Sequence, residues 1–457
     1  MAFDQQKVQD RLDELAGKHG VVGASVAVLA DDAIVEASTG VLNLDTGVEA
    51  TPDSLFQIGS ITKVWTASLV MRLVDEGVLD LDVPVVSYLP EFRVADPDAT
   101  ARVTVRHLLA HSSGIDGDLF LDTGRGDDCL QRYVAACSEL EQKHPVGATM
   151  SYCNSGYSVL GRLLEVLRGG SWDSVLREGL IAPLGLTHTV TLPEEVLRFR
   201  AALGHVGEPG EVHPAPVWGL MRSAGPAGLI CSTARELLAF ARLHLDGGVA
   251  ADGTRVLSAG AVAAMQEPQI AVPDRWTLGG AWGLGWILFD WDGRKVYGHD
   301  GATLGQAAYL RIVPDRRVAI ALVTNGGGSG DLYSELFREL LADVAELDMP
   351  RRPEPAADPE PVDRSPYLGS YRSVSVLLEV TAGDGAGLHL RMTPTTPIAA
   401  MLETAPQEMD LFPVEPDVYV GRLPGQQSWT PCVFFTLPDG SRYVHLGARA
   451  TRKVSTD

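Results

Sequence analysis

A serine and a lysine three positions apart, Ser60 and Lys63, are the residues best suited to chemistry. Only six of the 37 basic residues are lysines, and no other lysine has a serine three positions before it. Arginine keeps its proton in proteins, whereas a desolvated lysine can lose it. In a helix that begins near Ser60, residues i and i+3 share one face, so the hydroxyl and the amine would meet. The pair predicts a serine activated for acyl transfer, although a single Ser-x-x-Lys also occurs by chance on exposed helices.

Two further motifs could complete such a site. Tyr152-Cys153-Asn154 lies immediately before an expected helix, and His299-Asp300-Gly301 lies where an expected strand begins. Acyl transfer through serine needs a group that protonates the leaving atom, groups that hold the substrate, and donors for the oxyanion. Residues of these types can serve those purposes.

In this order, the three motifs resemble those of the serine β-lactamase and penicillin-binding-protein family, most closely its class C β-lactamases, family VIII esterases and D-aminopeptidases. Residues 56–59, 108–114, 226–228 and 282–286 add to the likeness, which spans about residues 5–345. One departure is His299-Asp300-Gly301, where many relatives carry Lys-Thr-Gly. A histidine keeps a donor for a substrate carboxylate or carbonyl, but its charge is conditional near neutral pH. Strong carboxylate binding is therefore less expected.

The resemblance implies a role for each catalytic residue. Ser60 would attack the acyl carbon while Lys63 takes its proton, with a lysine pKa lowered by partial burial and the nearby helix N-terminus. Tyr152 would carry a proton to the leaving group, and to the serine during deacylation. Asn154 would orient Lys63 and the substrate amide. His299 would lie across the cleft and bond the substrate or Tyr152.

Other residues would bind substrate. The backbone N–H groups of the nucleophile and of Ala302, beside Gly301, would form the oxyanion hole, as the resemblance implies. Trp218 lies in a further segment of likeness and is expected near the substrate. Arg449 and Arg452, at the end of the chain's last domain, could contact peptide carbonyls, and solvated surface charge is the alternative for both.

Hydrophobic periodicity and turn residues predict the elements that would position these motifs. A hairpin is expected at residues 21–30 and 33–39, and strands at 283–290, 294–298, 306–313 and 318–324. Helices are expected over residues 1–17, 62–76 with Gly77 as the C-cap, 104–111, 155–168, 172–180, 233–245 and 331–347. The helix over 233–245 would open on a capping box of Thr233 and Glu236. Strands at both ends with helices between them predict one sheet built from distant segments, with an inserted helical lobe.

The chain divides into two expected domains. Residues 1–348 would form an α/β catalytic domain of the β-lactamase-like fold, an antiparallel sheet flanked by helices plus the helical lobe. Residues 349–366 hold six prolines among charged residues and would form a semi-rigid linker. Residues 367–457 alternate short apolar runs with turn residues, which suits a small all-β barrel or a β-sandwich. The resemblance to known proteins implies a lipocalin-like barrel.

Composition excludes several classes of partner. The net charge of −22 disfavours nucleic acid and anionic membranes. No stretch resembles a signal peptide or approaches the roughly 20 apolar residues of a membrane span, so a cytoplasmic location is expected. The five cysteines are scattered without metal-site spacing, and we expect neither metal nor cofactor. His111 and Cys153 are expected to be structural.

Three functions fit this chemistry. The chain could hydrolyse peptides, esters or β-lactams, pass the acyl group to an amine, or be a non-catalytic binding protein. The whole chain resembles the penicillin-binding-protein-type thioesterases of peptide biosynthesis, with residues 118–128 and 213–218 adding to the likeness. This resemblance implies a stand-alone enzyme that takes a peptidyl thioester, from a carrier protein and through a D-residue, and releases a head-to-tail macrolactam. Tethering would favour the peptide's own amine over water.

Overall fold

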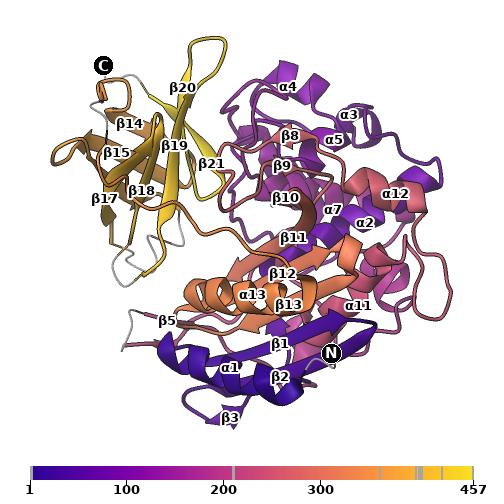
Figure 1. Ribbon diagram of the computed structural model, residues 1–457. Helices are drawn as coiled ribbons and strands as arrows, with labels where there is room; N and C mark the ends of the chain where they lie inside the picture. The colour runs from indigo at the N-terminus through magenta and orange to yellow at the C-terminus, as the bar shows by residue number, and fades with distance from the viewer. Residues whose placement is uncertain are drawn as a thin grey trace.

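A nine-stranded antiparallel sheet forms the centre of the larger domain (Figure 1). The computed structural model describes residues 4–207, 211–359, 362–396, 399, 405–423 and 426–454. The strand order is β3-β2-β1-β13-β12-β11-β10-β9-β8. Their bounds are Gly23–Ala30 for β1, Ala33–Asn43 for β2, Val48–Glu49 for β3, Ile270–Ala271 for β8, Ala281–Trp282 for β9, Ile287–Trp291 for β10, Arg294–Thr303 for β11, Gln306–Val313 for β12 and Val318–Thr324 for β13. Because β1 pairs with β13, the two ends of the domain meet in one sheet, which confirms the predicted fold class.

Both faces of the sheet are covered, so the central strands are apolar throughout. Along β1, Val26 and Val28 pack with helices α1 (Gln5–Lys18) and α13 (Ser329–Ala345), whereas Ala27 and Leu29 pack into the core on the other face. Successive side chains of a strand point to opposite faces. A strand that is covered on both faces therefore needs apolar residues at successive positions, as residues 26–29 of β1 show.

The helical lobe and the second face of the sheet contain the remaining helices. They are α2 (Thr62–Asp75), α3 (Val85–Tyr88), α4 (Pro97–Arg102), α5 (Val105–Leu109), α6 (Cys129–Ala136), α7 (Asn154–Arg168), α8 (Trp172–Leu176), α9 (Pro193–Val196), α10 (Gly225–Gly228), α11 (Ala234–Leu245) and α12 (Ala259–Met265). Two short ribbons pair β4 (Phe56–Gln57) with β7 (Cys231–Ser232) and β5 (His205–Val206) with β6 (His213–Pro214). Within the described ranges, no helix is both long and apolar enough to cross a lipid bilayer.

Several predicted elements differ in their limits. The strand expected over 283–290 begins only at Ile287, because Gly283 bonds back to the Trp286 carbonyl and Gly285 has a φ of 94°. The helix expected over 104–111 ends at Leu109, before His111 takes a left-handed φ of 55°. The strand expected over 294–298 continues to Thr303, so His299 lies inside β11 rather than at the start of a strand.

Two predicted helix ends carry the expected residues. Gly77 follows α2 with a φ of 71°, the left-handed conformation of a C-terminal glycine cap. Thr233 caps α11 by accepting the N–H of Glu236. The second half of the predicted capping box is wrong, because the Glu236 carboxylate instead accepts the backbone N–H groups of Thr187 and His188.

Eight strands at the C-terminal end form a closed antiparallel barrel, as predicted. They are β14 (Gly369–Arg372), β15 (Val376–Ala382), β16 (Leu388–Pro394), β17 (Gln407–Glu415), β18 (Val418–Gly421), β19 (Thr430–Thr436), β20 (Arg442–Leu446) and β21 (Arg449–Lys453). Closure comes from β14, which pairs with β21. The described residues between α13 and β14 form neither helix nor strand.

The barrel packs against the helical lobe and the end of the sheet that carries β8 to β11 (Figure 1). The turn between β20 and β21 reaches the larger domain, where the Ala448 carbonyl accepts the N–H of Tyr152 at 2.9 Å. Ala450 N donates to Ser151 Oγ at 3.2 Å, and the Tyr443 hydroxyl donates to the Lys143 carbonyl at 2.9 Å. These contacts fix the barrel beside one of the predicted catalytic motifs.

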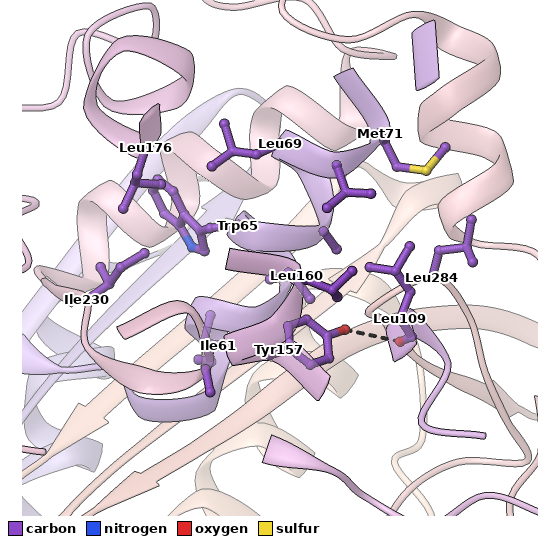
Figure 2. Packing of buried hydrophobic residues seen from close by; sticks show 14 of the residues in the cluster. Ile61, Trp65, Leu69, Met71, Leu109, Tyr157, Leu160, Leu176, Ile230 and Leu284 are labelled. Carbon is purple, nitrogen blue, oxygen red and sulfur yellow. Dashed lines mark hydrogen bonds between the residues drawn. The ribbon is translucent and has the colours of Figure 1, made fainter. Parts of the chain in front are cut away.

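Helix α2 is anchored by the core that Figure 2 shows. Trp65 is fully buried and stacks on Phe240 with ring centroids 4.1 Å apart. Tyr157 of α7 belongs to the same cluster, and its hydroxyl donates to the Leu109 carbonyl at 3.0 Å (Figure 2). The helix that carries Lys63 is thereby held in place by apolar packing.

Trp65→Ala should lower the free energy of unfolding by about 3–5 kcal/mol, because a fully buried aromatic side chain leaves a cavity. Denaturant unfolding followed by circular dichroism would measure this. Leu197→Ala is the matched control, since Leu197 is 83% exposed, and it should change stability by less than about 0.5 kcal/mol. Equal losses in the two variants would contradict this account of the core.

Candidate active site

Ser60 lies in a 3₁₀ turn, Gly59–Ile61, that leads directly into α2. Gly59 has a φ of 51°, and a Cβ on it would lie 2.6 Å from the amide nitrogen of Ala302 in β11. Only glycine combines this conformation with so close an approach. The turn therefore holds the serine at the N-terminal end of a helix and against the edge of a sheet strand.

Lys63 is brought to the serine as its spacing predicts. Its Nζ lies 3.0 Å from Ser60 Oγ and 2.7 Å from the Ala227 carbonyl oxygen, and the side chain is fully buried. Burial, followed by the positive charge of Arg449, holds the pKa of Lys63 well below its ordinary value, against a smaller opposing effect of Asp118. A neutral amine in this position can accept the serine proton.

Tyr152 is the proton donor that the geometry supports. The Nζ atom of Lys63 lies 4.7 Å from the centroid of the Tyr152 ring. The Tyr152 hydroxyl is buried and has no well-oriented hydrogen-bond partner among the described residues. Burial raises the pKa of Tyr152, which the nearby Ser60 hydroxyl lowers to a smaller extent. The phenol is therefore protonated at neutral pH and can give its proton to a leaving group.

Asn154 begins α7 and bonds elsewhere than predicted. Its Nδ2 donates to Asp118 Oδ1 at 2.7 Å, while Lys63 bonds to Ser60 and Ala227. The expected orientation of Lys63 by Asn154 is therefore not what the structure shows. The buried carboxylate of Asp118 takes the amide because it needs donors on all its oxygens.

His299 offers an acceptor where a donor was expected. Its Nδ1 lies 2.6 Å from the Asp300 carbonyl oxygen, which assigns the proton to Nδ1 and leaves Nε2 as an acceptor. Nε2 is buried and has no hydrogen-bond partner among the residues that the structure describes. Burial, together with the charge of Lys63, lowers the pKa of His299 to about 3. The imidazole is neutral, so it supplies no positive charge for a substrate carboxylate.

Gly301 allows β11 to pass directly beside the nucleophile. A Cβ on Gly301 would collide with the carbonyl oxygen of Ile58 and lie 3.0 Å from the backbone nitrogen of Ser60. Ala302 is the next residue and lies against Gly59. The backbones of Ser60 and Ala302 are thus adjacent, as a shared oxyanion hole requires.

A cleft of about 640 Å³ opens at these residues. Its lining is largely apolar and includes Leu119, Phe120, Leu220, Leu278, Trp282 and Ile287. The barrel contributes Ala448 and Arg449 to this lining. Of these two, Arg449 was predicted from the sequence as a possible substrate contact. Arg452 is exposed and is absent from the described lining, which favours the surface-charge alternative for this residue.

Trp218 is not among the described residues that line the cleft. Its indole Nε1 donates to the Ala202 carbonyl at 3.0 Å, and the ring packs against the cluster of Leu55 and Val196. The structure thus places Trp218 in this cluster and not in the lining of the cleft, and its contact with substrate stays a prediction.

His111 and Cys153 pack beside Tyr152 in the interior. The His111 ring stacks on Tyr152 at 4.1 Å, and its Nδ1 accepts the Cys153 N–H at 3.1 Å. Burial raises the pKa of the Cys153 thiol to about 11, so it is protonated. Within the described part of the chain, no group of three or more His, Cys, Asp or Glu side chains could hold a metal ion.

Sequence reasoning missed Asp118 as a site residue. It lies within the segment 118–128 that carried part of the resemblance, but its carboxylate had no partner in the sequence pattern. Its partners are Asn154 and Arg449, which are remote along the chain, so only the tertiary structure joins them.

A serine paired with a buried lysine, beside a tyrosine and a His-x-Gly strand, defines a serine hydrolase or acyltransferase. The β-lactamase family model matches residues 8–344, and the chain belongs to this family. It is 51% identical over 374 residues to Penicillin-binding protein 4 of Amycolatopsis lactamdurans, an alignment that covers 81% of this chain and 98% of that protein.

Solved structures resemble both domains together. The crystal structure of SurE aligns with a TM-score of 0.77 at 31% identity and covers 98% of this chain and 99% of SurE. A second SurE structure, with D-Leu, aligns with a TM-score of 0.75. The octameric penicillin-binding protein homologue from Pyrococcus abyssi has a TM-score of 0.66 at 22% identity over 99% of this chain and 100% of its own, a likeness of fold alone.

Gly301→Ala should slow acylation of Ser60 by about 100-fold or more, because the added methyl group pushes β11, with the Ala302 N–H, away from the backbone of Ser60. Stopped-flow measurement of the burst with an aryl ester would test this. Gly280→Ala is the matched control, since a Cβ there meets no atom within 4 Å, and it should acylate at the parent rate. A normal burst in Gly301→Ala would contradict the proposed geometry.

The acylation rate should rise with pH through the pKa of Lys63 and reach a plateau well below the ordinary lysine value of about 10.4. The rate rises with pH because only the neutral amine accepts the serine proton, and burial lowers the pKa at which this form appears. A pH–rate profile of the burst phase measures this limb. Lys63→Arg keeps a cation that cannot deprotonate and should abolish the burst at every pH.

Proposed function

We propose that this protein transfers a peptidyl group from a thioester to Ser60 and then to the amine at the other end of the same peptide, which releases a macrolactam. In the first step Oγ bonds to the acyl carbon and the C–S bond breaks. Lys63 takes the serine proton, Tyr152 gives its proton to the departing thiolate, and the proton on Lys63 then passes to Tyr152, which leaves both groups neutral. In the second step the amine attacks the ester carbon, the C–O bond breaks, and the amine proton returns to the serine through Lys63. No water is consumed.

The observation that carries this proposal is the apolar cleft at Ser60 that the barrel helps to build. Leu119, Phe120 and Leu278 line it, and the barrel places Ala448 and Arg449 at the same cleft. Such walls limit the water beside an acyl-enzyme and leave space for a peptide that folds back on itself. An amine held close to the ester can reach a very high effective concentration and outrun water.

The neutral state of His299 supports attack on the acyl-enzyme by an amine and argues against a substrate that needs a cation for its carboxylate. Its Nε2 has no hydrogen-bond partner among the residues that the structure describes, so it can accept a bond from an incoming N–H group. The neutral ring offers no cation to the carboxylate of a β-lactam. The overall likeness to SurE, which was also solved with D-Leu, supports a D-residue at the acylating position. A carrier protein is the donor that the family resemblance implies.

Hydrolysis is the second candidate, because the chain belongs to the β-lactamase family and is similar to a protein named Penicillin-binding protein 4. In that case water replaces the amine in the second step. An esterase, a D-aminopeptidase, a DD-peptidase and a β-lactamase would all use the same acyl-enzyme. A binding protein without catalysis would form no such ester.

A linear peptidyl thioester that ends in a D-residue should yield a cyclic product whose mass is that of the linear acid less one water. Liquid chromatography with mass spectrometry measures both products. The matched peptide that ends in the L-residue should cyclise at least about tenfold more slowly, since its acyl group would present the wrong face to Ser60.

Ser60→Ala is the control and should form neither product nor a covalent adduct. Linear acid alone, with rapid turnover of an aryl ester or a chromogenic β-lactam, would defeat cyclisation and favour hydrolysis. Turnover that persists in Ser60→Ala would defeat the serine mechanism itself.

A further inference from the structure

Asp118 is a buried carboxylate that joins the two domains at the active site. Its side chain is 4% exposed. Oδ1 accepts Asn154 Nδ2 at 2.7 Å and Arg449 Nη2 at 3.1 Å, and Oδ2 accepts Arg449 Nε at 2.9 Å. A paired arginine and carboxylate in this two-pronged geometry fix each other's orientation. One partner belongs to the Tyr-x-Asn motif and the other to the barrel.

We propose that Asp118 is a positioning residue that holds Arg449 of the barrel beside Tyr152 and sets the balance of charge around Lys63. The inference rests on the proposed acyl transfer at Ser60. It assigns the barrel a part in acylation itself, in addition to any part in placing the acceptor amine.

The chain around Asp118 is fixed to the catalytic motif. The carbonyl of Gly117 accepts both the N–H and the hydroxyl of Ser155, at 2.8 and 2.9 Å. Ser155 is the second residue of α7, directly after Asn154. The carboxylate therefore cannot move relative to the Tyr-x-Asn motif without breaking backbone contacts.

The barrel presents Arg449 from a tight hairpin turn. Gly447 and Ala448 connect β20 to β21 with φ values of 55° and 70°. A left-handed conformation is costly for alanine, and such residues occur where function requires a fixed backbone. The Ala448 carbonyl accepts the Tyr152 N–H, and the Arg449 guanidinium lies 5.0 Å from the centroid of the Tyr152 ring. The turn thus meets the tyrosine through both its backbone and its charge.

A second buried carboxylate on the same segment provides a comparison. Asp116 pairs with Lys143 at 2.9 Å and accepts the N–H of Val374, in the barrel, at 2.6 Å. It also binds the barrel, but its contacts do not include the Tyr-x-Asn motif or Arg449. A substitution at Asp116 therefore tests the effect of barrel docking alone, without a change of charge beside Tyr152.

The charges that face Lys63 come from both domains. Arg449 favours the neutral amine and lowers its pKa, whereas Asp118 favours the ammonium form. Burial lowers the pKa of His299 to about 3 and that of His111 well below its ordinary value, so neither changes charge near neutral pH. The other titratable groups near the amine are Tyr152, Tyr157 and Cys153, and burial raises the pKa of each.

Opposite shifts of the pH–rate profile would test the proposal. The probe is 4-nitrophenyl acetate, which is too small to need peptide contacts, and the readout is the midpoint of the acid limb of burst-phase acylation. Asp118→Asn removes a negative charge and should move the midpoint to lower pH. Arg449→Gln removes a positive charge and should move it to higher pH. The double variant should lie between the two, because the charges compensate.

Asp116→Asn is the matched control and should keep the parent midpoint. The plateau rate of Asp118→Asn should also fall, by up to the roughly 100-fold that misplacement of a site by 1 Å can cost. Circular dichroism and size-exclusion chromatography would establish that each variant is folded.

Midpoints that stay unchanged, or that move in the same direction in Asp118→Asn and Arg449→Gln, would overturn the proposal while leaving the acyl transfer intact. A shift in Asp116→Asn equal to that in Asp118→Asn would also overturn it, because docking alone would then explain the effect. If the parent protein forms no ester at Ser60, the proposed function fails and this inference fails with it.

Discussion

Burial of the amine of Lys63 is the constraint on which the rest of the site depends. An ammonium group removed from water is costly, so the folded protein favours the neutral amine that catalysis needs. The same burial acts on its neighbours, because Tyr152 and His299 also lie in the interior and remain neutral. One physical condition therefore prepares a base, a proton donor and an uncharged acceptor together. The apolar packing of α2, centred on Trp65, maintains that condition.

The barrel is part of this arrangement and not an appendage. Its hairpin turn binds the backbone of Tyr152 and brings Arg449 to the cleft. A guanidinium close to the buried amine of Lys63 would be unfavourable without a counterion, and Asp118 supplies one. The pair lets the barrel place a guanidinium at the active site while the negative charge limits its effect on Lys63. Docking and electrostatics are thereby linked through a single carboxylate.

The replacement of Lys-Thr-Gly by His299-Asp300-Gly301 changes the chemistry of the opposite wall. Gly301 preserves the close passage of β11 beside the serine, so the oxyanion geometry does not depend on the residue two positions earlier. His299 is among the residues that line the cleft, and in its neutral form its buried Nε2 is an acceptor and carries no positive charge. A neutral wall of this kind supplies no cation for a substrate carboxylate.

The sequence by itself determined the contact between Ser60 and Lys63, the sheet built from distant segments and the all-β C-terminal domain, because helical spacing and apolar periodicity are local properties. The family resemblance added the particular fold and the closed barrel. It also located Tyr152 and Gly301 through motifs that keep a fixed order. The tertiary structure alone decided which side chains meet across the chain: Asn154 bonds to Asp118 instead of Lys63, and Trp218 packs against the cluster of Leu55 and Val196. The proton on His299 was likewise set by its bond to a backbone carbonyl. Long-range partners, burial and protonation depend on the packing of distant segments, and no local pattern encodes them.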